Sequence, residues 1–224
     1  MPDRRYYEAY DARYRAAHAM GIRWLGDAPT PIVGEILSRY GIDRDAAMLE
    51  LGCGEGRDAG PLMEAGCDLL AVDISPEAVA DCKKRYPAYA DRFRTLDCVR
   101  GSLEGAFAFL YAVALLHMLV EDADRKGFYR FVREHLTQDG LALICTMGDG
   151  ETERQSDPGE AFSPVERTHG AQRVVVAATS CRTVSFETLL RELRESGLSP
   201  VETGMTEVPG EFSQLMYAVV RRDR

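Results

Sequence analysis

The stretch MLELGCGEGRDAGPLMEAGCDLLAVDIS, residues 48–75, decides the fold of this chain. Two short apolar runs, 46–49 and 69–72, have the length of buried strands. Residues 57–65 between them read as a helix, and Asp73 ends the second run. The order strand, turn, helix, strand, acid is that of the nucleotide-binding half of a doubly wound sheet. We therefore predict an α/β fold with a Rossmann-like sheet.

Three alternating glycines lie in the turn that follows the first predicted strand. Gly52, Gly54 and Gly56 let the backbone turn sharply and come close to a ligand, because no Cβ stands in the way. Asp73 is expected at the tip of the second strand, where its carboxylate can accept hydrogen bonds from both hydroxyls of a ribose. The stretch therefore predicts a site for a nucleoside-containing ligand.

The charge of the turn distinguishes between two such ligands. Residues 54–59 also fit the dinucleotide fingerprint, so an NAD(P)-dependent oxidoreductase is one alternative. Glu50, two residues before the first glycine, would repel a pyrophosphate but suit a cationic ligand. Glu55 and Asp58 add negative charge, which Arg57 offsets only in part. This balance favours a ligand with an amino group, a sulfonium and no phosphate, which is S-adenosylmethionine.

Two segments resemble motifs of a known family. Residues 50–56 (ELGCGEG) resemble the first motif of the class I S-adenosylmethionine-dependent methyltransferases, and residues 71–75 (AVDIS) resemble their acidic second-strand motif. Within this family, the motifs at residues 52–58 and 72–75 most resemble those of the small-molecule enzymes that methylate tellurite and thiopurines. The resemblance spans roughly residues 48–222. It implies a seven-stranded sheet of order 3-2-1-4-5-7-6 in which strand 7 is antiparallel.

The resemblance also implies the residues that hold S-adenosylmethionine and its product S-adenosylhomocysteine. Glu50 would bind the amino end, Asp73 the ribose, and Asp97 the amino group of adenine, whose ring would meet the backbone N–H of Cys98. The alternative for Asp97 is an ordinary loop aspartate. The predicted cofactor-binding residues are Glu50, Gly52, Cys53, Gly54, Gly56, Asp73, Ile74, Asp97 and Cys98.

The most apolar run of the chain, 107–116, is expected to be the central fourth strand and its continuation. The family usually places an aspartate after the first phenylalanine of this strand, whereas here Ala108 follows Phe107. His117 comes next, at the strand end that faces the ligand crevice in an open α/β sheet. An imidazole there could take a proton from a hydroxyl, thiol or amine acceptor. The alternative is a histidine that stacks on the cofactor or satisfies the backbone.

Residues 1–30 precede the first strand and are expected to form a helical cap, with a helix over 6–20. Its tyrosines recur at helical spacing, which fits an amphipathic helix packed on the sheet and, by resemblance, a cap that shapes the acceptor pocket. The stretch 148–172 is polar and without a clear period, so we expect a loop, either solvated or a lid over the acceptor. The predicted substrate-binding residues are Tyr6, Tyr10, Tyr14, Trp24 and Arg154.

The rest of the chain continues the alternation of strands and helices. Thr30, before a proline, is expected to cap a helix, and Ser75 and Ser185 are expected to cap two others. Residues 138–140 are expected to stop a helix and turn. The remaining expected helices are 31–40, 76–85, 121–136 and 186–196, and the remaining expected strands are 93–96, 141–146, 173–178, 201–206 and 212–221.

Composition narrows the class of protein. A chain of 224 residues suits one domain, 1–224, and its formal charge of −9 with pI near 5.0 disfavours nucleic acid and anionic membranes as partners. Its six cysteines form no CxxC pair, so we expect that they do not bind a metal ion. We also expect their thiols to be reduced. No run has the length of a membrane span and the N-terminus has no signal-peptide core. We expect a soluble, cytoplasmic protein with a small-molecule substrate; homodimerisation stays open.

These observations together predict direct, in-line transfer of a methyl group from S-adenosylmethionine to a small molecule. Such a displacement needs positioning and exclusion of water more than covalent chemistry. Besides the oxidoreductase, one further alternative stays open, a catalytically silent module that binds the same cofactor. The missing acid after Phe107 favours this alternative slightly.

Overall fold

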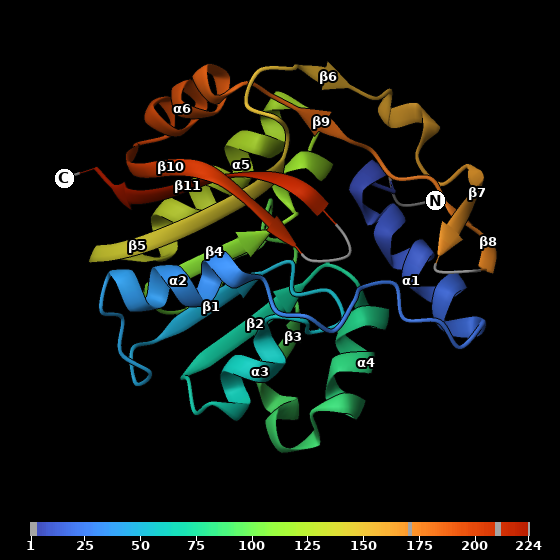
Figure 1. Cartoon of the computed structure of the whole chain (residues 1–224), viewed down its shortest axis with the longest axis horizontal. Coiled ribbons are helices and arrows are strands. Elements are labelled where there is room, and N and C mark those ends of the chain that lie inside the picture. The colour runs from blue at the N-terminus through green and yellow to red at the C-terminus, as the bar shows by residue number, and fades with distance from the viewer. Residues whose placement is uncertain (1–3, 170–171, 209–211, 224) are drawn as a thin grey trace.

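The computed structural model describes residues 4–169, 172–208 and 212–223. Its centre is a seven-stranded sheet of order β10-β11-β5-β4-β1-β2-β3 (Figure 1). Strands β1 to β5 are parallel to one another, while β11 is antiparallel to both β5 and β10. This order and the antiparallel insertion confirm the predicted sheet. The strands are β1 (Met48–Leu51), β2 (Leu69–Asp73), β3 (Phe93–Thr95), β4 (Phe107–Val113), β5 (Leu136–Met147), β10 (Leu198–Val208) and β11 (Phe212–Arg222).

Helices cover both faces of the sheet, because successive strand residues point to opposite sides. Leu49 and Leu51 pack in one core layer with residues of α5 and α6, while Met48 packs in the other with residues of α2, α3 and α4. Two buried layers of this kind are the mark of a doubly wound sheet. The helices are α2 (Pro31–Arg39), α3 (Ala59–Glu64), α4 (Pro76–Arg85), α5 (Asp122–His135) and α6 (Phe186–Glu195).

Local signals set the helix starts in all three predicted cases, because α2, α4 and α6 begin directly after Thr30, Ser75 and Ser185. The hydroxyl oxygens of Ser75 and Ser185 each accept a backbone N–H from the third residue of the helix that follows, which confirms both caps. Thr30 occupies the N-cap position of α2, but its hydroxyl makes no capping bond. Its hydroxyl donates a 2.9 Å hydrogen bond to Asp58 instead, so it ties the start of α2 to the glycine turn.

The turn predicted at residues 138–140 is also wrong. Strand β5 begins at Leu136, directly after α5, and runs through these residues. Its pairing with β4 shifts between Phe107 and Phe109, so the extra residues form an irregularity inside the strand. Gly140 fits there because a Cβ would lie 3.0 Å from the carbonyl oxygen of Phe107.

A cap lies beside the carboxyl ends of the parallel strands (Figure 1). It combines the N-terminal helix α1 with a hairpin of β7 and β8, which lies inside and just after the stretch predicted to be a loop. The prediction of an irregular loop over 148–172 is therefore wrong, although the strand expected at 173–178 is present as β8. The cap elements and short segments are η1 (Tyr6–Glu8), α1 (Ala9–Ala19), η2 (Pro87–Arg92), η3 (Leu116–Met118), β6 (Arg154–Gln155), η4 (Pro158–Glu160), β7 (Pro164–His169), β8 (Gln172–Ala177) and β9 (Arg182–Thr183).

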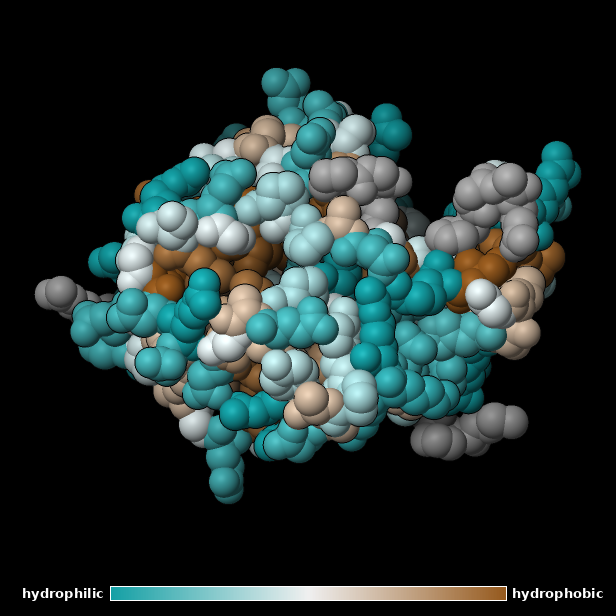
Figure 2. Space-filling view, turned by 60° about the horizontal axis from the view of Figure 1, so that its bottom comes forward, coloured by the Kyte–Doolittle hydropathy of each residue, from teal (hydrophilic) through white to brown (hydrophobic). Residues whose placement is uncertain are grey.

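The surface is mainly hydrophilic on the face that Figure 2 shows, with apolar atoms gathered at the β7–β8 hairpin on the right and in a second area on the left. Val175 in β8 is 60% exposed. Within the described ranges, no helix combines the length and the apolar character that crossing a membrane requires.

Candidate functional site

A cavity lies between the cap and the carboxyl ends of β1 to β4, with about 570 Å³ of empty space when the open solvent at its mouth is included. This is where open α/β sheets bind ligands. Aromatic residues of the cap form one side, and the strand ends form the other. The lining residues are Tyr7, Tyr10, Tyr14, Gly52, Asp73, Ile74, Leu96, Asp97, Cys98, Val99, Leu115, Met118 and Leu119.

The glycine turn needs glycine at the positions that approach this cavity. Gly52 has φ +72°, and a Cβ there would lie 2.3 Å from Cδ1 of Leu115. Gly54 has φ +52°, and a Cβ there would lie 2.7 Å from the hydroxyl oxygen of Tyr14. Gly56 instead faces the core, where a Cβ would meet the thiol of Cys82 at 3.1 Å. The first two glycines therefore shape the cavity, and the third allows close packing of α4 beneath the turn.

Asp73 ends β2 at the floor of the cavity. One carboxylate oxygen accepts the backbone N–H of Gly54 and the other that of Ser75, both at 2.8 Å. Burial raises the pKa of Asp73 to about 6, although these two hydrogen bonds oppose the rise. The next residue, Ile74, also lines the cavity. The side chain is thus fixed in place with its remaining acceptor capacity facing the ligand space.

Asp97 and Cys98 lie together at the end of β3, as predicted. One oxygen of Asp97 accepts the backbone N–H of Val99 at 2.8 Å. The other accepts hydrogen bonds from the Arg5 guanidinium and from the Tyr7 hydroxyl, the latter at 3.2 Å. Both bonds come from the cap, so this carboxylate links the N-terminal segment to the cavity wall. An adenine amino group would share it with Arg5.

Glu50 and Cys53 lie beneath the turn and do not line the cavity. Glu50 is 3% exposed and accepts a 3.0 Å hydrogen bond from Tyr111. Burial, with the nearby charge of Asp58, raises the pKa of Glu50 well above its usual range. Cys53 is 2% exposed and packs in the core. The charge that the sequence suggests at Glu50 is therefore suppressed by its surroundings.

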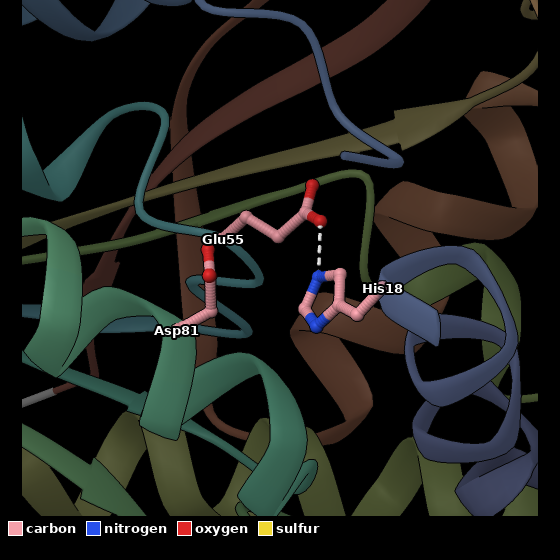
Figure 3. Close-up of side chains that lie close together, drawn as sticks. All are labelled: His18, Glu55 and Asp81. Atoms are coloured by element: carbon pink, nitrogen blue, oxygen red, sulfur yellow. Dashed lines mark hydrogen bonds and ion pairs between the residues drawn. The ribbon is translucent and has the colours of Figure 1, made fainter. Parts of the chain in front are cut away.

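The other acids of the turn are hydrogen-bonded within the protein. Glu55 accepts a 2.7 Å hydrogen bond from Nε2 of His18, and its oxygens also accept the backbone N–H groups of Trp24 and Leu25 at 2.9 and 2.6 Å. Figure 3 shows how His18 on α1 reaches Glu55 in the turn. Nδ1 of the same ring lies 2.8 Å from Glu77 on α4. His18 therefore clamps the cap onto the turn and the sheet.

His18, Glu55 and Asp81 have ligand atoms within 4.8 Å of one another, close enough for a metal ion (Figure 3). Both ring nitrogens of His18 are already engaged with carboxylates. Burial alone would lower the pKa of His18, but the hydrogen bonds that its ring donates to Glu55 and Glu77 raise it. A protonated ring cannot bind a metal, so the contacts fit an ion-pair cluster better than a metal centre.

His117 lies in η3 at the carboxyl end of β4, as expected, but it does not line the cavity. It is 3% exposed, its ring centroid lies 6.4 Å from that of Phe212, and Nδ1 has no hydrogen-bond partner. Burial, with the charges of Arg125 and Arg13, lowers its pKa to about 4. The ring is therefore neutral near pH 7. Its neighbours Leu115, Met118 and Leu119 line the cavity instead.

The cap tyrosines divide into two groups. Tyr7, Tyr10 and Tyr14 line the cavity, whereas the hydroxyl of Tyr6 donates a 2.8 Å hydrogen bond to Asp124 on α5. Tyr7 was not among the predicted substrate residues, although it lies three and seven residues before Tyr10 and Tyr14, a spacing that places all three on one helical face. Tyr6 thus anchors the cap to the sheet domain.

The other two predicted substrate residues lie away from the cavity lining. Trp24 packs beside the cap, with the Arg13 guanidinium 4.9 Å from its ring centroid. Arg154 is exposed in β6. The structure therefore brings Tyr10 and Tyr14 to the cavity wall, and leaves Trp24 and Arg154 outside it.

Comparison with known proteins agrees with this geometry. Residues 48–140 match the family model described as a methyltransferase domain. The match covers β1 to the start of β5, which is less than half of the chain, and includes the strand ends that carry the glycine turn, Asp73 and Asp97. The match and the strand order both support the sequence-based prediction of a class I methyltransferase.

Solved methyltransferases share the fold. The 1,6-didemethyltoxoflavin-N1-methyltransferase of Burkholderia thailandensis, determined with its didemethyltoxoflavin ligand and S-adenosylhomocysteine, has a TM-score of 0.69 and 21% identity, over 98% of this chain and 89% of its own. The CcbJ methyltransferase of Streptomyces caelestis has a TM-score of 0.67 and 18% identity, over 96% and 99%. At these identities the likeness concerns the fold.

A curated relative matches part of the chain. A tabtoxin biosynthesis enzyme of Pseudomonas amygdali pv. tabaci is 28% identical over 130 residues, which are 57% of this chain and 48% of that enzyme. The chain therefore spans about half the length of this relative.

Proposed function

We propose that this protein binds S-adenosylmethionine in the cavity at the carboxyl ends of β1 to β4 and transfers its methyl group to a small molecule. The observation that carries the proposal is the joint placement of Gly52, Asp73, Ile74, Asp97 and Cys98 around one cavity of a methyltransferase domain. The fold neighbours determined with this cofactor or its product support the choice of ligand.

Each wall of the cavity suits one part of that ligand. Asp73 offers carboxylate oxygens to the ribose hydroxyls, and Asp97 with the backbone of Cys98 faces the place for adenine. Gly52 and Leu115 line the part of the cavity proposed for the methionine portion. Ile74 and Leu96 supply apolar contacts for the base. The acids Glu50 and Glu55 are bonded inside the protein, so they support the turn rather than the ligand.

The ligand supplies an electrophilic methyl group, and the protein orients the reactants and excludes water. Displacement at that carbon needs an acceptor atom in line with the bond that breaks, and correct placement can contribute roughly 7–11 kcal/mol to lowering the barrier. The rings of Tyr7, Tyr10 and Tyr14 close the cavity on the cap side and exclude water. His117 stays the predicted base for hydroxyl acceptors, although burial lowers its pKa to about 4, which makes it a weak base, and its side chain does not line the cavity.

Turnover with a panel of acceptors tests the proposal. The protein is incubated with methyl-labelled S-adenosylmethionine and small thiols, phenols and amines, and labelled product is measured together with S-adenosylhomocysteine. We expect both to form in equal amounts with at least one class. Tight binding of S-adenosylhomocysteine without turnover of any class would support the silent binding module instead. The missing acid after Phe107 keeps that alternative open.

A further inference from the structure

Arg13 on the cap helix is a buried cation without an acidic partner among the described residues. It is 6% exposed, and its side chain bonds to one acceptor, the carbonyl oxygen of Ala177 in β8, through Nε at 3.1 Å and Nη2 at 3.0 Å. A guanidinium has five N–H donors. Three of them are not used by these two bonds.

The surroundings of Arg13 are aromatic and cationic. Its Cζ lies 5.0 Å from the ring centroid of Tyr10 and 4.9 Å from that of Trp24, so two rings flank the charge. Cation–π contacts offset only part of the cost of burying a guanidinium. Burial, with the nearby positive charge of Arg167, lowers the pKa of Arg13. No protein group described here neutralises this region.

The same region borders the proposed acceptor side of the cavity. Tyr10 lines the cavity together with Tyr14, and the charge of Arg13 is among those that lower the pKa of His117. Two buried polar atoms among the described residues have no hydrogen-bond partner and are linked to Arg13. They are Nδ1 of His117, whose pKa the charge of Arg13 lowers, and Oγ of Ser180, three residues after the Ala177 to which Arg13 bonds. Buried polar groups without partners are rare, so a polar ligand could satisfy them.

We infer that Arg13 binds an anionic group, most simply a carboxylate, of the methyl acceptor. A planar guanidinium matches a carboxylate through two parallel hydrogen bonds, and such charge-assisted pairs are about twice as strong as neutral ones. Tyr10 and Trp24 hold the guanidinium plane in place. The inference rests on the proposed function, because it assigns the acceptor side of that cavity to small acidic molecules.

Trp24 provides a built-in reporter for the test, because it is the single tryptophan of the chain and flanks Arg13. The protein is first saturated with S-adenosylhomocysteine, whose binding is followed separately by calorimetry. Tryptophan emission is then recorded during titration with three matched pairs: benzoate and benzamide, cyclohexanecarboxylate and its amide, and N-acetylglycine and its amide. We expect saturable changes with carboxylates and responses at least about tenfold weaker with the amides.

Three variants separate anion binding from structural roles. Arg13→Gln should abolish the preference for carboxylates, and Arg13→Lys should keep a weaker preference, while S-adenosylhomocysteine binds both with unchanged affinity. Arg15→Gln removes an exposed cation from the same helix and should behave as the unaltered protein. Melting temperatures show whether loss of the bond to Ala177 unfolds the cap.

The outcomes are distinct. Equal responses to acids and amides, no response to any carboxylate, or a preference that survives in Arg13→Gln would each overturn the anion site. If Arg13→Gln fails to fold, the Arg13→Lys variant is used instead. Lysine lacks the planar guanidinium, so a preference for carboxylates that is as strong as in the unaltered protein would contradict the proposal. Failure to bind S-adenosylhomocysteine in the calorimeter would instead contradict the proposed function itself.

Discussion

Replacing Asp73 by asparagine tests the ribose contact with the least disturbance. Alanine would leave the backbone N–H groups of Gly54 and Ser75 without acceptors, and each buried unpaired donor costs about 1–3 kcal/mol. Asparagine keeps the shape of the side chain and one acceptor oxygen, so only one of these two backbone N–H groups loses its partner. It removes the charge that strengthens a hydrogen bond from a ribose hydroxyl, and hydrogen bonds to charged groups contribute about 1.5–3 kcal/mol.

That range corresponds to a roughly 10- to 150-fold loss of affinity for S-adenosylhomocysteine, measured by calorimetry near pH 7.5. Asp68→Asn is the matched control, because this half-exposed carboxylate precedes the other end of β2 and pairs with Arg92 on the surface. It should bind with unchanged affinity. The assignment of Asp73 to the ribose would be refuted if Asp73→Asn bound as tightly as the control.

The raised pKa of Asp73 adds a pH dependence to the same experiment. The ligand hydroxyls need the ionised carboxylate, so affinity should be full above pH 7 and fall as the pH drops through about 6. At pH 5 about a tenth of the carboxylate remains ionised in the free protein, which predicts a roughly tenfold weaker affinity. Asp73→Asn should show no such fall between pH 7 and 5. An equal fall in the variant would assign the titration to another group.

Three further predictions follow from the turn and the cap. His18→Gln should lower the melting temperature most at acidic pH. The raised pKa of His18 gives a stabilisation that is complete below about pH 6.5 and is lost as the pH rises through the raised value. A difference in melting temperature that does not change with pH would contradict the clamp. Gly52→Ala should abolish binding of S-adenosylhomocysteine, because its Cβ would meet Leu115 at 2.3 Å, whereas Gly66→Ala, with φ +86° and no atom within 4 Å of the added Cβ, should lose only about 1–2 kcal/mol of stability and bind normally. His117→Ala should slow methylation of hydroxyl acceptors more than that of thiols; equal losses would argue against a base.

Local sequence signals were sufficient to predict the first two strands of the sheet and the turn between them. The glycine turn, Asp73 and the proline-started helix after Ser75 depend on neighbours in the chain, so their placement could be predicted. The antiparallel insertion of β11 came from the resemblance and is confirmed. The hairpin of β7 and β8 was missed because β7, PVERTH, carries mainly polar side chains and shows no apolar alternation.

The partners of charged residues could not be predicted from the sequence. The sequence suggests that Glu50 and Glu55 place negative charge around the ligand. In the structure, Tyr111 hydrogen-bonds to Glu50 and His18 to Glu55, and both partners lie far away in the chain. The electrostatic preference for a sulfonium therefore rests on fewer free charges than the sequence suggests. Tyr7, in contrast, could have been predicted, because its spacing to Tyr10 and Tyr14 places it on the same helical face, which lines the cavity.

The proposed methyl transfer depends most directly on which ligand the cavity binds. Calorimetric titration of the purified protein with S-adenosylhomocysteine, S-adenosylmethionine and NAD measures it without knowledge of the acceptor. We expect saturable binding of the two sulfur compounds with one site per chain and no detectable binding of NAD. Binding of NAD with neither sulfur compound retained would contradict the proposed methyl transfer.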